Sequence, residues 1–273
     1  MPELAEVETF KIQLSKELIG ETIIRVKVNH LRSIRRHETP KEFIDLLVNQ
    51  KIIDITRFGK YLALHLENGL ILNAHLRMSG RFLKNASCVD DPKHSHIILE
   101  TKNNRVVFVD PRTFGEMWIT KSVTQETTVG IDALLSDKTE LQNILTNLGA
   151  VSKRPIKSVL LDQKYISGIG NIYADEICAE SKLDINKRIC DLTKREIEEL
   201  VVSIKAVFNK AVKYRGSSLR DESFVDLYGK IGQYQKFHIV HAKKDMHCSN
   251  CSGHITKSKI AGRTSYFCEN CQT

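Results

Sequence analysis

The chain has 273 residues, of which 41% are hydrophobic and 27% are charged, with 14 Gly and 5 Pro. This composition excludes collagen-like, low-complexity and wholly disordered chains, and the length predicts about two domains. No apolar run approaches the roughly 18 residues of a membrane span. The acidic start, MPELAE, is unlike a signal or transit peptide, so we expect a cytoplasmic protein that does not bind membranes. The net charge of +8 fits either a solvated basic surface or a polyanionic partner such as nucleic acid.

The first half of the chain predicts short strands behind one helix. Apolar residues at helical spacing predict a helix over residues 3–19 that ends at Gly20. Apolar alternation or apolar runs predict strands, the last two forming a hairpin, over residues 24–28, 62–66, 96–101 and 105–110. We therefore expect an α+β chain whose N-terminal domain, residues 2–133, is a β-sandwich with one helix.

From residue 134 the pattern becomes helical. Leu141, Ile144 and Leu148 share one helical face, and Gly149 is expected to end that helix. Pro155 is expected at the first position of the next helix, because its fixed φ suits that place.

Three further segments complete the predicted helical domain, residues 134–237. Gly168–Asn171 breaks the pattern before a helix that runs to about residue 182, and residues 193–214 predict a long amphipathic helix. Residues 215–237 mix Gly, Ser, Asp and Tyr without periodicity and predict a mobile loop.

The last 36 residues, 238–273, contain two C-x-x-C pairs. Cys248 and Cys251 are separated by sixteen residues from Cys268 and Cys271, which is the spacing of a tetrahedral zinc site. Four thiolates fill the coordination shell, so we expect one structural Zn²⁺ per chain in a β-hairpin finger. Free or redox thiols and an iron–sulfur cluster are the alternatives. Residues 257–263 between the pairs are basic and suit phosphate contact.

Several segments of the chain resemble motifs of one enzyme family. They are MPELAEVET at 1–9, GKYL at 59–62, HLRMSG at 75–80, KHSH at 93–96, DPRTFG at 110–115, GIGNIYADE at 168–176 and the final C-x-x-C pairs. In this order they resemble the bacterial-type formamidopyrimidine-DNA glycosylases of the Fpg/Nei family, over the whole chain. The segment at 168–176 resembles the helix–two-turn–helix motif of that family.

The resemblance implies roles for named residues of this chain. It implies a catalytic group of Pro2, Glu3, Lys60 and Arg263, DNA contacts by His94, Arg112, Lys157 and Asn171, and an intercalating trio of Met78, Arg112 and Phe114. Asn171 has a separate argument, since a glycine-flanked helix N-terminus presents free N–H groups to an anion. Ala5 replaces a usual second proline and residues 241–245 replace a usual Tyr-Gly-basic stretch, but neither departure removes a reacting group.

The chemistry implied by the resemblance suits an N-terminal proline. Removal of Met1 exposes the secondary amine of Pro2, which is less basic than lysine and more often unprotonated near neutral pH. Attack on the anomeric carbon displaces the base and leaves an iminium whose positive charge acidifies the C2′ proton, so both flanking phosphates can be eliminated. Glu3 is placed to act as general acid and base, and Glu6, one helical turn on, to tune it.

The sequence therefore predicts a monomeric glycosylase and abasic-site lyase that removes oxidised purines, 8-oxoguanine and formamidopyrimidines, from damaged duplex DNA. Leu4 after Glu3 and the segment 216–221, which resembles the lesion-capping loop of the purine-directed branch, favour purines. Two alternatives remain open. One is an endonuclease VIII-like enzyme for oxidised pyrimidines, and the other is a non-catalytic zinc-finger protein that binds damaged DNA.

Overall fold

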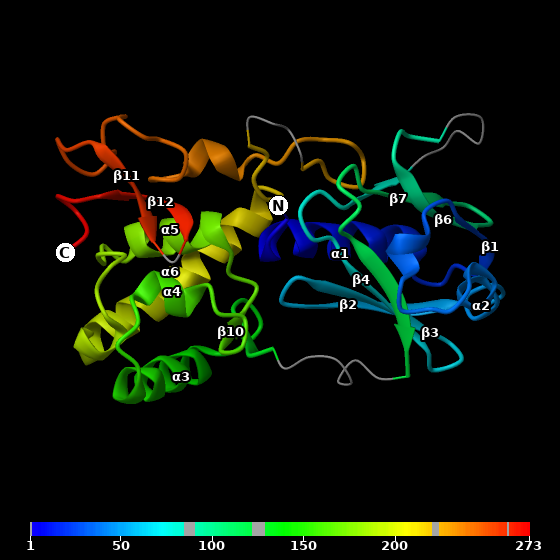
Figure 1. Cartoon of the computed structure of the whole chain (residues 1–273), viewed down its shortest axis with the longest axis horizontal. Coiled ribbons are helices and arrows are strands. Elements are labelled where there is room, and N and C mark those ends of the chain that lie inside the picture. The colour runs from blue at the N-terminus through cyan, green and yellow to red at the C-terminus, as the bar shows by residue number, and fades with distance from the viewer. Residues whose placement is uncertain (1, 85–90, 122–128, 220–223, 261) are drawn as a thin grey trace. The chain divides into compact units, whose positions relative to one another are not determined.

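The computed structural model describes residues 2–84, 91–121, 129–219, 224–260 and 262–273 (Figure 1). The chain forms two compact units. The N-terminal unit is Met1–Thr127 with Tyr214–Gln235, and the C-terminal unit is Thr128–Lys213 with Lys236–Thr273. None of the helices in these described ranges combines the length and the apolar character that crossing a membrane requires.

The N-terminal unit contains one long helix and two four-stranded antiparallel sheets (Figure 1). The sheet orders are β1-β6-β7-β5 and β2-β3-β4-β8. The elements are α1 (Leu4–Leu18), β1 (Ile23–Val28), η1 (Leu31–Ile34), α2 (Pro40–Asp45), β2 (Ile52–Phe58), β3 (Tyr61–Leu66), β4 (Ile71–His75), β5 (Arg81–Lys84), β6 (Ser95–Thr101), β7 (Arg105–Val109) and β8 (Glu116–Thr120).

One apolar core joins α1 to both sheets, which confirms the predicted β-sandwich with its helix. Phe10 of α1 lies edge-on to Phe82 of β5, with ring centroids 5.8 Å apart, and edge-on to Phe224 at 5.6 Å. Strand β1 starts with a bulge, so Ile23 is buried whereas the next residue, Ile24, is 56% exposed. The simple alternation expected over residues 24–28 therefore begins one residue late.

The C-terminal unit contains the remaining helices and a two-stranded hairpin (Figure 1). Helices α5 and α6 pack with Tyr173 and Phe208 in contact, their ring centroids 5.1 Å apart. The elements are β9 (Ile131–Asp132), α3 (Lys138–Val151), α4 (Ile156–Leu160), β10 (Ile166–Ser167), α5 (Asn171–Glu180), η3 (Ile189–Asp191), α6 (Lys194–Lys213), β11 (Ile255–Ile260) and β12 (Arg263–Cys268), with η4 (Tyr234–Phe237) spanning the chain boundary between the units.

Two helix ends differ from the prediction. Gly149 does not end α3, which continues to Val151. Its missing Cβ instead lets the carbonyl oxygen of Ile189 approach, 3.2 Å from where a Cβ would lie. Pro155 precedes the first residue of α4 and occupies its N-cap position. By contrast, α6 spans Lys194–Lys213, within one residue of the predicted helix at each end.

The segment Tyr214–Gln235 packs with the N-terminal unit, although the sequence grouped it with the helices. Contacts to α1 hold the segment there, among them two hydrogen bonds of Gln13. Gln13 donates a hydrogen bond to the buried carboxylate of Asp226 at 3.1 Å and accepts one from the Leu227 N–H at 2.9 Å. The predicted lesion-capping loop falls partly on residues 220–223, which lie outside the described residues.

Candidate active site and nucleic-acid interface

Two residues of the predicted catalytic group, Pro2 and Glu3, directly precede α1. Pro2 is buried and Glu3 is 1% exposed. The Glu6 carboxylate accepts the Glu3 N–H at 2.8 Å through one oxygen and the Ser217 N–H at 2.7 Å through the other. Gly216, at φ +74°, has no room for a side chain, because a Cβ there would lie 2.5 Å from Glu6 Oε1. Glu6 therefore ties the segment around Ser217 to the helix start beside Pro2.

Lys60 lies in the tight turn between β2 and β3, and an arginine connects that turn to the same helix. Arg57 donates from Nε to Glu8 of α1 at 2.5 Å and from Nη1 to the carbonyl of Gly59 at 2.9 Å. Gly59 has φ +57°, which suits a two-residue hairpin turn. The structure thus brings Lys60 and the start of α1 into one hydrogen-bonded framework.

Asp110 organises the two loops that carry the predicted intercalating trio. Its carboxylate is fully buried and accepts the Ser79 hydroxyl at 2.5 Å, the Arg112 N–H at 3.2 Å and the Gly115 N–H at 2.6 Å. The Arg112 N–H also donates to the Ser79 hydroxyl at 3.2 Å. The sequence reasoning assigned no role to Asp110. The sequence signal for this role is a carboxylate that directly follows a buried apolar strand and precedes a turn, where it can accept backbone N–H groups.

Met78 and Phe114 project from these two loops with 38% and 40% of their surface exposed. The Arg112 guanidinium carbon lies 5.4 Å from the centroid of the Phe114 ring, and Arg112 itself is exposed. His94 is also exposed, and its carbonyl accepts the Asp110 N–H at 3.1 Å. Large apolar side chains that are held in order but left in solvent are available to a partner.

In the C-terminal unit, the start of α5 meets the start of β12. Asn171 Nδ2 donates to the Thr264 carbonyl at 2.8 Å, next to the exposed Arg263. The Asn171 Oδ1 is buried and has no hydrogen-bond partner among the residues that the structure describes. Asn171 and Arg263 therefore lie together at a helix N-terminus, which is a favourable place for an anion.

Lys157, which the resemblance assigns to DNA contact, does not lie at the surface. Its side chain is fully buried, and its ammonium donates to Asp175 at 2.5 Å and to the Ser265 hydroxyl at 2.6 Å. Asp175 also contacts His241 Nδ1 at 3.0 Å and the Tyr266 N–H at 3.3 Å. An ammonium without exposed surface is not available to a phosphate. The pair instead joins α4 and α5 to the β11–β12 hairpin.

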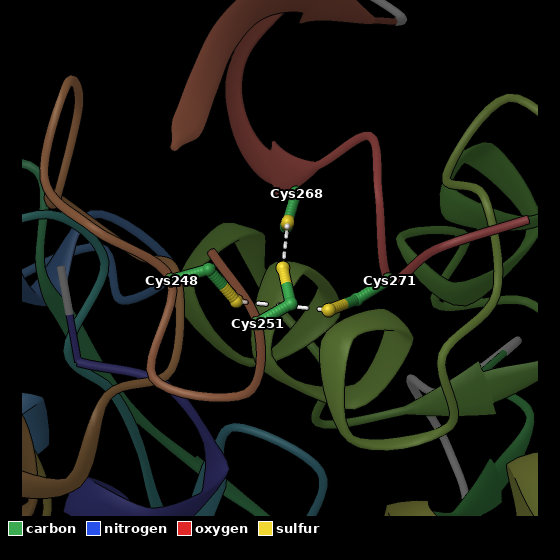
Figure 2. Close-up of side chains that lie close together, drawn as sticks. All are labelled: Cys248, Cys251, Cys268 and Cys271. Atoms are coloured by element: carbon green, nitrogen blue, oxygen red, sulfur yellow. Dashed lines mark hydrogen bonds between the residues drawn. The ribbon is translucent and has the colours of Figure 1, made fainter. Parts of the chain in front are cut away.

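The four predicted metal ligands converge. Figure 2 shows the side chains of Cys248, Cys251, Cys268 and Cys271 pointing toward one another, and all four sulfurs lie within 4.8 Å. Two sulfur–sulfur distances are 3.7 Å and 3.5 Å. A tetrahedron with Zn–S bonds of ~2.3 Å has edges of about 3.8 Å, so these residues fit one zinc ion.

Comparisons with known proteins find relatives that match this chain over its whole length. Family models described as "Formamidopyrimidine-DNA glycosylase N-terminal domain", "Formamidopyrimidine-DNA glycosylase H2TH domain" and "Zinc finger found in FPG and IleRS" match residues 1–117, 129–223 and 248–273. The formamidopyrimidine-DNA glycosylase of Listeria monocytogenes is 37% identical over 277 residues, covering 100% of both chains. The chain belongs to the formamidopyrimidine-DNA glycosylase family.

Other relatives agree. The formamidopyrimidine-DNA glycosylase of Pelotomaculum thermopropionicum is 36% identical over 276 residues, covering 100% of this chain and 99% of the relative. A solved complex of the Lactococcus lactis enzyme with DNA that contains an abasic site has a TM-score of 0.90 and 30% identity, with 100% of both chains covered. The family membership confirms the predicted fold class, and with the clustered cysteines it confirms one structural zinc.

The Lys157–Asp175 pair generates a stability prediction. Lys157→Ala leaves the buried Asp175 carboxylate without its cation, so it should lower the free energy of unfolding by about 3–5 kcal/mol. Lys187→Ala is the matched control, since its pair with Glu196 is partly exposed and should contribute at most about 1 kcal/mol. Urea unfolding measures both. If the Lys157→Ala protein instead had wild-type stability and bound DNA with a reduced salt dependence, the result would support Lys157 as a phosphate contact.

The cysteine cluster generates a second prediction. Cys268→Ser should remove the bound zinc and abolish DNA binding, because the finger cannot fold without the ion, while the N-terminal unit stays folded. Cys190→Ser is the control, since that thiol is exposed and outside the cluster. Metal analysis and a duplex-binding assay measure the two effects. Full zinc content in the Cys268→Ser protein, or an iron–sulfur absorbance in the wild type, would contradict the assignment.

Proposed function

We propose that the chain is a base-excision-repair glycosylase and abasic-site lyase that removes oxidised purines from duplex DNA, with Pro2 as its nucleophile. The curated relatives carry the name formamidopyrimidine-DNA glycosylase, and the related Lactococcus lactis structures contain abasic-site DNA. The proposal includes action as a monomer in the cytoplasm, in association with the nucleoid. The observation that carries it is the bonding of the Glu6 carboxylate to the Glu3 and Ser217 N–H groups at the helix start that directly follows the buried Pro2.

The start of α1 supports the nucleophile role. Once Met1 is removed, Pro2 offers a secondary amine at the end of a helix whose first residues are held by Glu6. Attack at the anomeric carbon breaks the bond to the base, and the ring-opened product is an iminium. Its positive charge favours loss of the C2′ proton, so the 3′ phosphate and then the 5′ phosphate are eliminated. Glu3, almost fully buried beside Pro2, serves as the general acid and base.

Fully or partly exposed residues of each unit support duplex binding. Lys60 and His94 in the N-terminal unit, and Asn171 and Arg263 in the C-terminal unit, are suited to backbone phosphates. Met78 and Phe114 are apolar wedges that can fill the space of a flipped nucleotide, and the Arg112 fork can pair with the orphaned base. Phosphate contacts hold the duplex, and the wedge selects a base that leaves the stack easily.

The nucleophile is tested by substitution. Pro2→Gly should keep duplex binding but lose most base excision and strand nicking, and retention of Met1 should have the same effect. Pro40→Gly is the matched control, because Pro40 only starts α2. Borohydride trapping on oligonucleotides with single purine or pyrimidine lesions, followed by mass spectrometry, identifies both the attached residue and the preferred lesion. A trapped adduct on Lys60, with Pro2→Gly fully active, would overturn the assignment. Binding without any trapped adduct would favour a non-catalytic protein.

The wedge is tested by the base opposite the lesion. Arg112→Ala should cost about 1–3 kcal/mol of binding, by an amount that depends on the opposite base, because a bidentate contact to a base edge is lost. Arg263→Ala should weaken damaged and undamaged duplexes alike, since phosphate contacts carry no base information. Fluorescence anisotropy with four opposite bases compares the two variants. A uniform loss for Arg112→Ala would make Arg112 another phosphate contact.

A further inference from the structure

A series of buried hydrogen bonds leads from an ion pair in the C-terminal unit to the backbone of Arg263. Lys157 of α4 is fully buried against Asp175 of α5, and its ammonium donates to the Ser265 hydroxyl at 2.6 Å. That hydroxyl is also fully buried and donates to the carbonyl of Arg263 at 3.4 Å. Lys157, Asp175 and Ser265 are called here the Lys157 cluster. The cluster therefore reaches the backbone of the residue that is expected to contact phosphate.

The first residues of β12 are held one after another by helices of the same unit. The Thr264 carbonyl accepts Asn171 Nδ2 at 2.8 Å and the Lys157 ammonium at 3.5 Å. The Tyr266 N–H donates to Asp175 Oδ2 at 3.3 Å. The start of β12 thus packs on the first half of α5, and the side chain of Arg263 stays exposed at the strand end (Figure 1).

Zinc ligation acts at the opposite end of the same strand. Arg263 pairs with Ile260 at the tip of the hairpin, whereas Cys268 is the last residue of β12. At ~3.3 Å per residue, the strand places them roughly 17 Å apart. A four-cysteine site fixes the geometry close to its ligands, so the metal alone leaves the tip free to bend away from α5. The Lys157 cluster supplies the contacts at the tip.

The neighbouring carboxylate of α5, Glu176, holds a different part of the finger. Its oxygens accept the N–H groups of residues 239–241 at 2.6, 3.0 and 2.8 Å. Those residues precede the first cysteine pair, so Glu176 fastens the segment that enters the finger. Loss of the Lys157–Asp175 pair would therefore leave this entry attached to α5 by Glu176 and would release the contacts at the start of β12.

The directional donors of the ion pair matter more here than its charge. Removal of two charges from water largely offsets their attraction, so apolar side chains of similar size could stabilise the unit as well. Apolar side chains, however, have no donor for the Ser265 hydroxyl or the Thr264 carbonyl. The Lys157 ammonium donates to both, and thereby gives the start of β12 a defined orientation.

We propose that the Lys157 cluster positions Arg263 and so determines whether this residue contacts a backbone phosphate of the duplex. Lys157, Asp175 and Ser265 are positioning residues that do not touch DNA, since all three are fully buried. The proposal rests on the proposed function, because it takes the contact between Arg263 and phosphate as given. It separates two requirements of the finger: zinc forms the hairpin, and the cluster orients its tip.

A double-mutant cycle between Ser265 and Arg263 tests this coupling without any turnover. The probe is a duplex with one tetrahydrofuran abasic-site analogue, and anisotropy measures its affinity between about 50 mM and about 400 mM salt. Arg263→Ala should lower the wild-type affinity about fivefold at ~0.15 M salt and reduce the slope of log K against log salt by about 0.9. In the Ser265→Ala protein it should change the affinity by less than about twofold, because Arg263 is already displaced.

Ser258→Ala is the matched control for Ser265→Ala. Ser258 lies directly opposite Ser265 on β11, but it is exposed. In the Ser258→Ala protein, Arg263→Ala should keep its full effect on affinity and on the salt slope. Metal analysis of each variant shows whether the finger has formed, and Ser265→Ala should retain its zinc. Zinc loss in Ser265→Ala would overturn the separation of the two requirements.

A second cycle uses the ion pair itself. Lys157→Met/Asp175→Asn removes both charges together and leaves no unpaired buried ion, and the new amide oxygen can still accept the Tyr266 N–H. Arg263→Ala should again change the affinity of this protein by less than about twofold. A direct phosphate contact by Lys157 would instead make the two losses add. A cluster that only stabilised the unit would lower the free energy of unfolding without changing the effect of Arg263→Ala.

The outcomes separate this proposal from the proposed function. Additive losses in both cycles would overturn positioning by the cluster, while duplex binding and a trapped Pro2 adduct would stand. Coupled losses without any trapped adduct would support the cluster and overturn the nucleophile. Unchanged affinity after Arg263→Ala in the wild type would overturn the phosphate contact and its positioning together, and trapping on Pro2 would still decide the reaction.

Discussion

Burial of carboxylates is the constraint on which the local order of both units depends. Glu6, Asp110, Glu116, Asp175 and Glu176 are all at most 1% exposed. A carboxylate removed from water is costly unless N–H groups, hydroxyls or cations replace the lost hydration. The donors to Glu6, Asp110 and Glu176 come from loops, so satisfying these carboxylates also fixes a loop. The donors to Asp175 come mainly from α4 and β12, so this carboxylate joins regular elements. Met78, Arg112 and Phe114 lie on loops that Asp110 holds in this way.

The regular elements and the metal site could be predicted because their signals are local. Apolar residues recur at helical spacing over the twenty residues of α6, and two C-x-x-C pairs identify the four metal ligands. Helix α1 and the β6–β7 hairpin were predicted for the same reason. The family motifs added candidate residues that periodicity alone does not reveal. The resulting site roles of Lys60, His94 and Arg112 remain predictions.

The features that could not be predicted depend on partners far apart in the sequence. Lys157 resembled a surface cation until the structure placed it against Asp175 and Ser265, 18 and 108 residues away. The partners of Glu116 likewise come from the stretch after η1 and from the turn after β4. No local pattern distinguishes a lysine or arginine that is paired internally from one that faces solvent. Only the tertiary structure decides between a stabilising role and a binding role.

The buried carboxylates also determine whether the loops lose their conformational entropy during folding or on binding. Met78 and Phe114 lie on loops joined by Asp110 and by the Arg77–Glu116 pair, so these loops are ordered during folding. If a loop became ordered only on association, each immobilised side chain would reduce the favourable free energy of binding by about 0.5–1.5 kcal/mol. Extruding a base from duplex DNA itself costs a few kcal/mol. In the proposed function, a preordered wedge leaves the free energy of binding available for base extrusion, which must precede attack by the proposed nucleophile, Pro2.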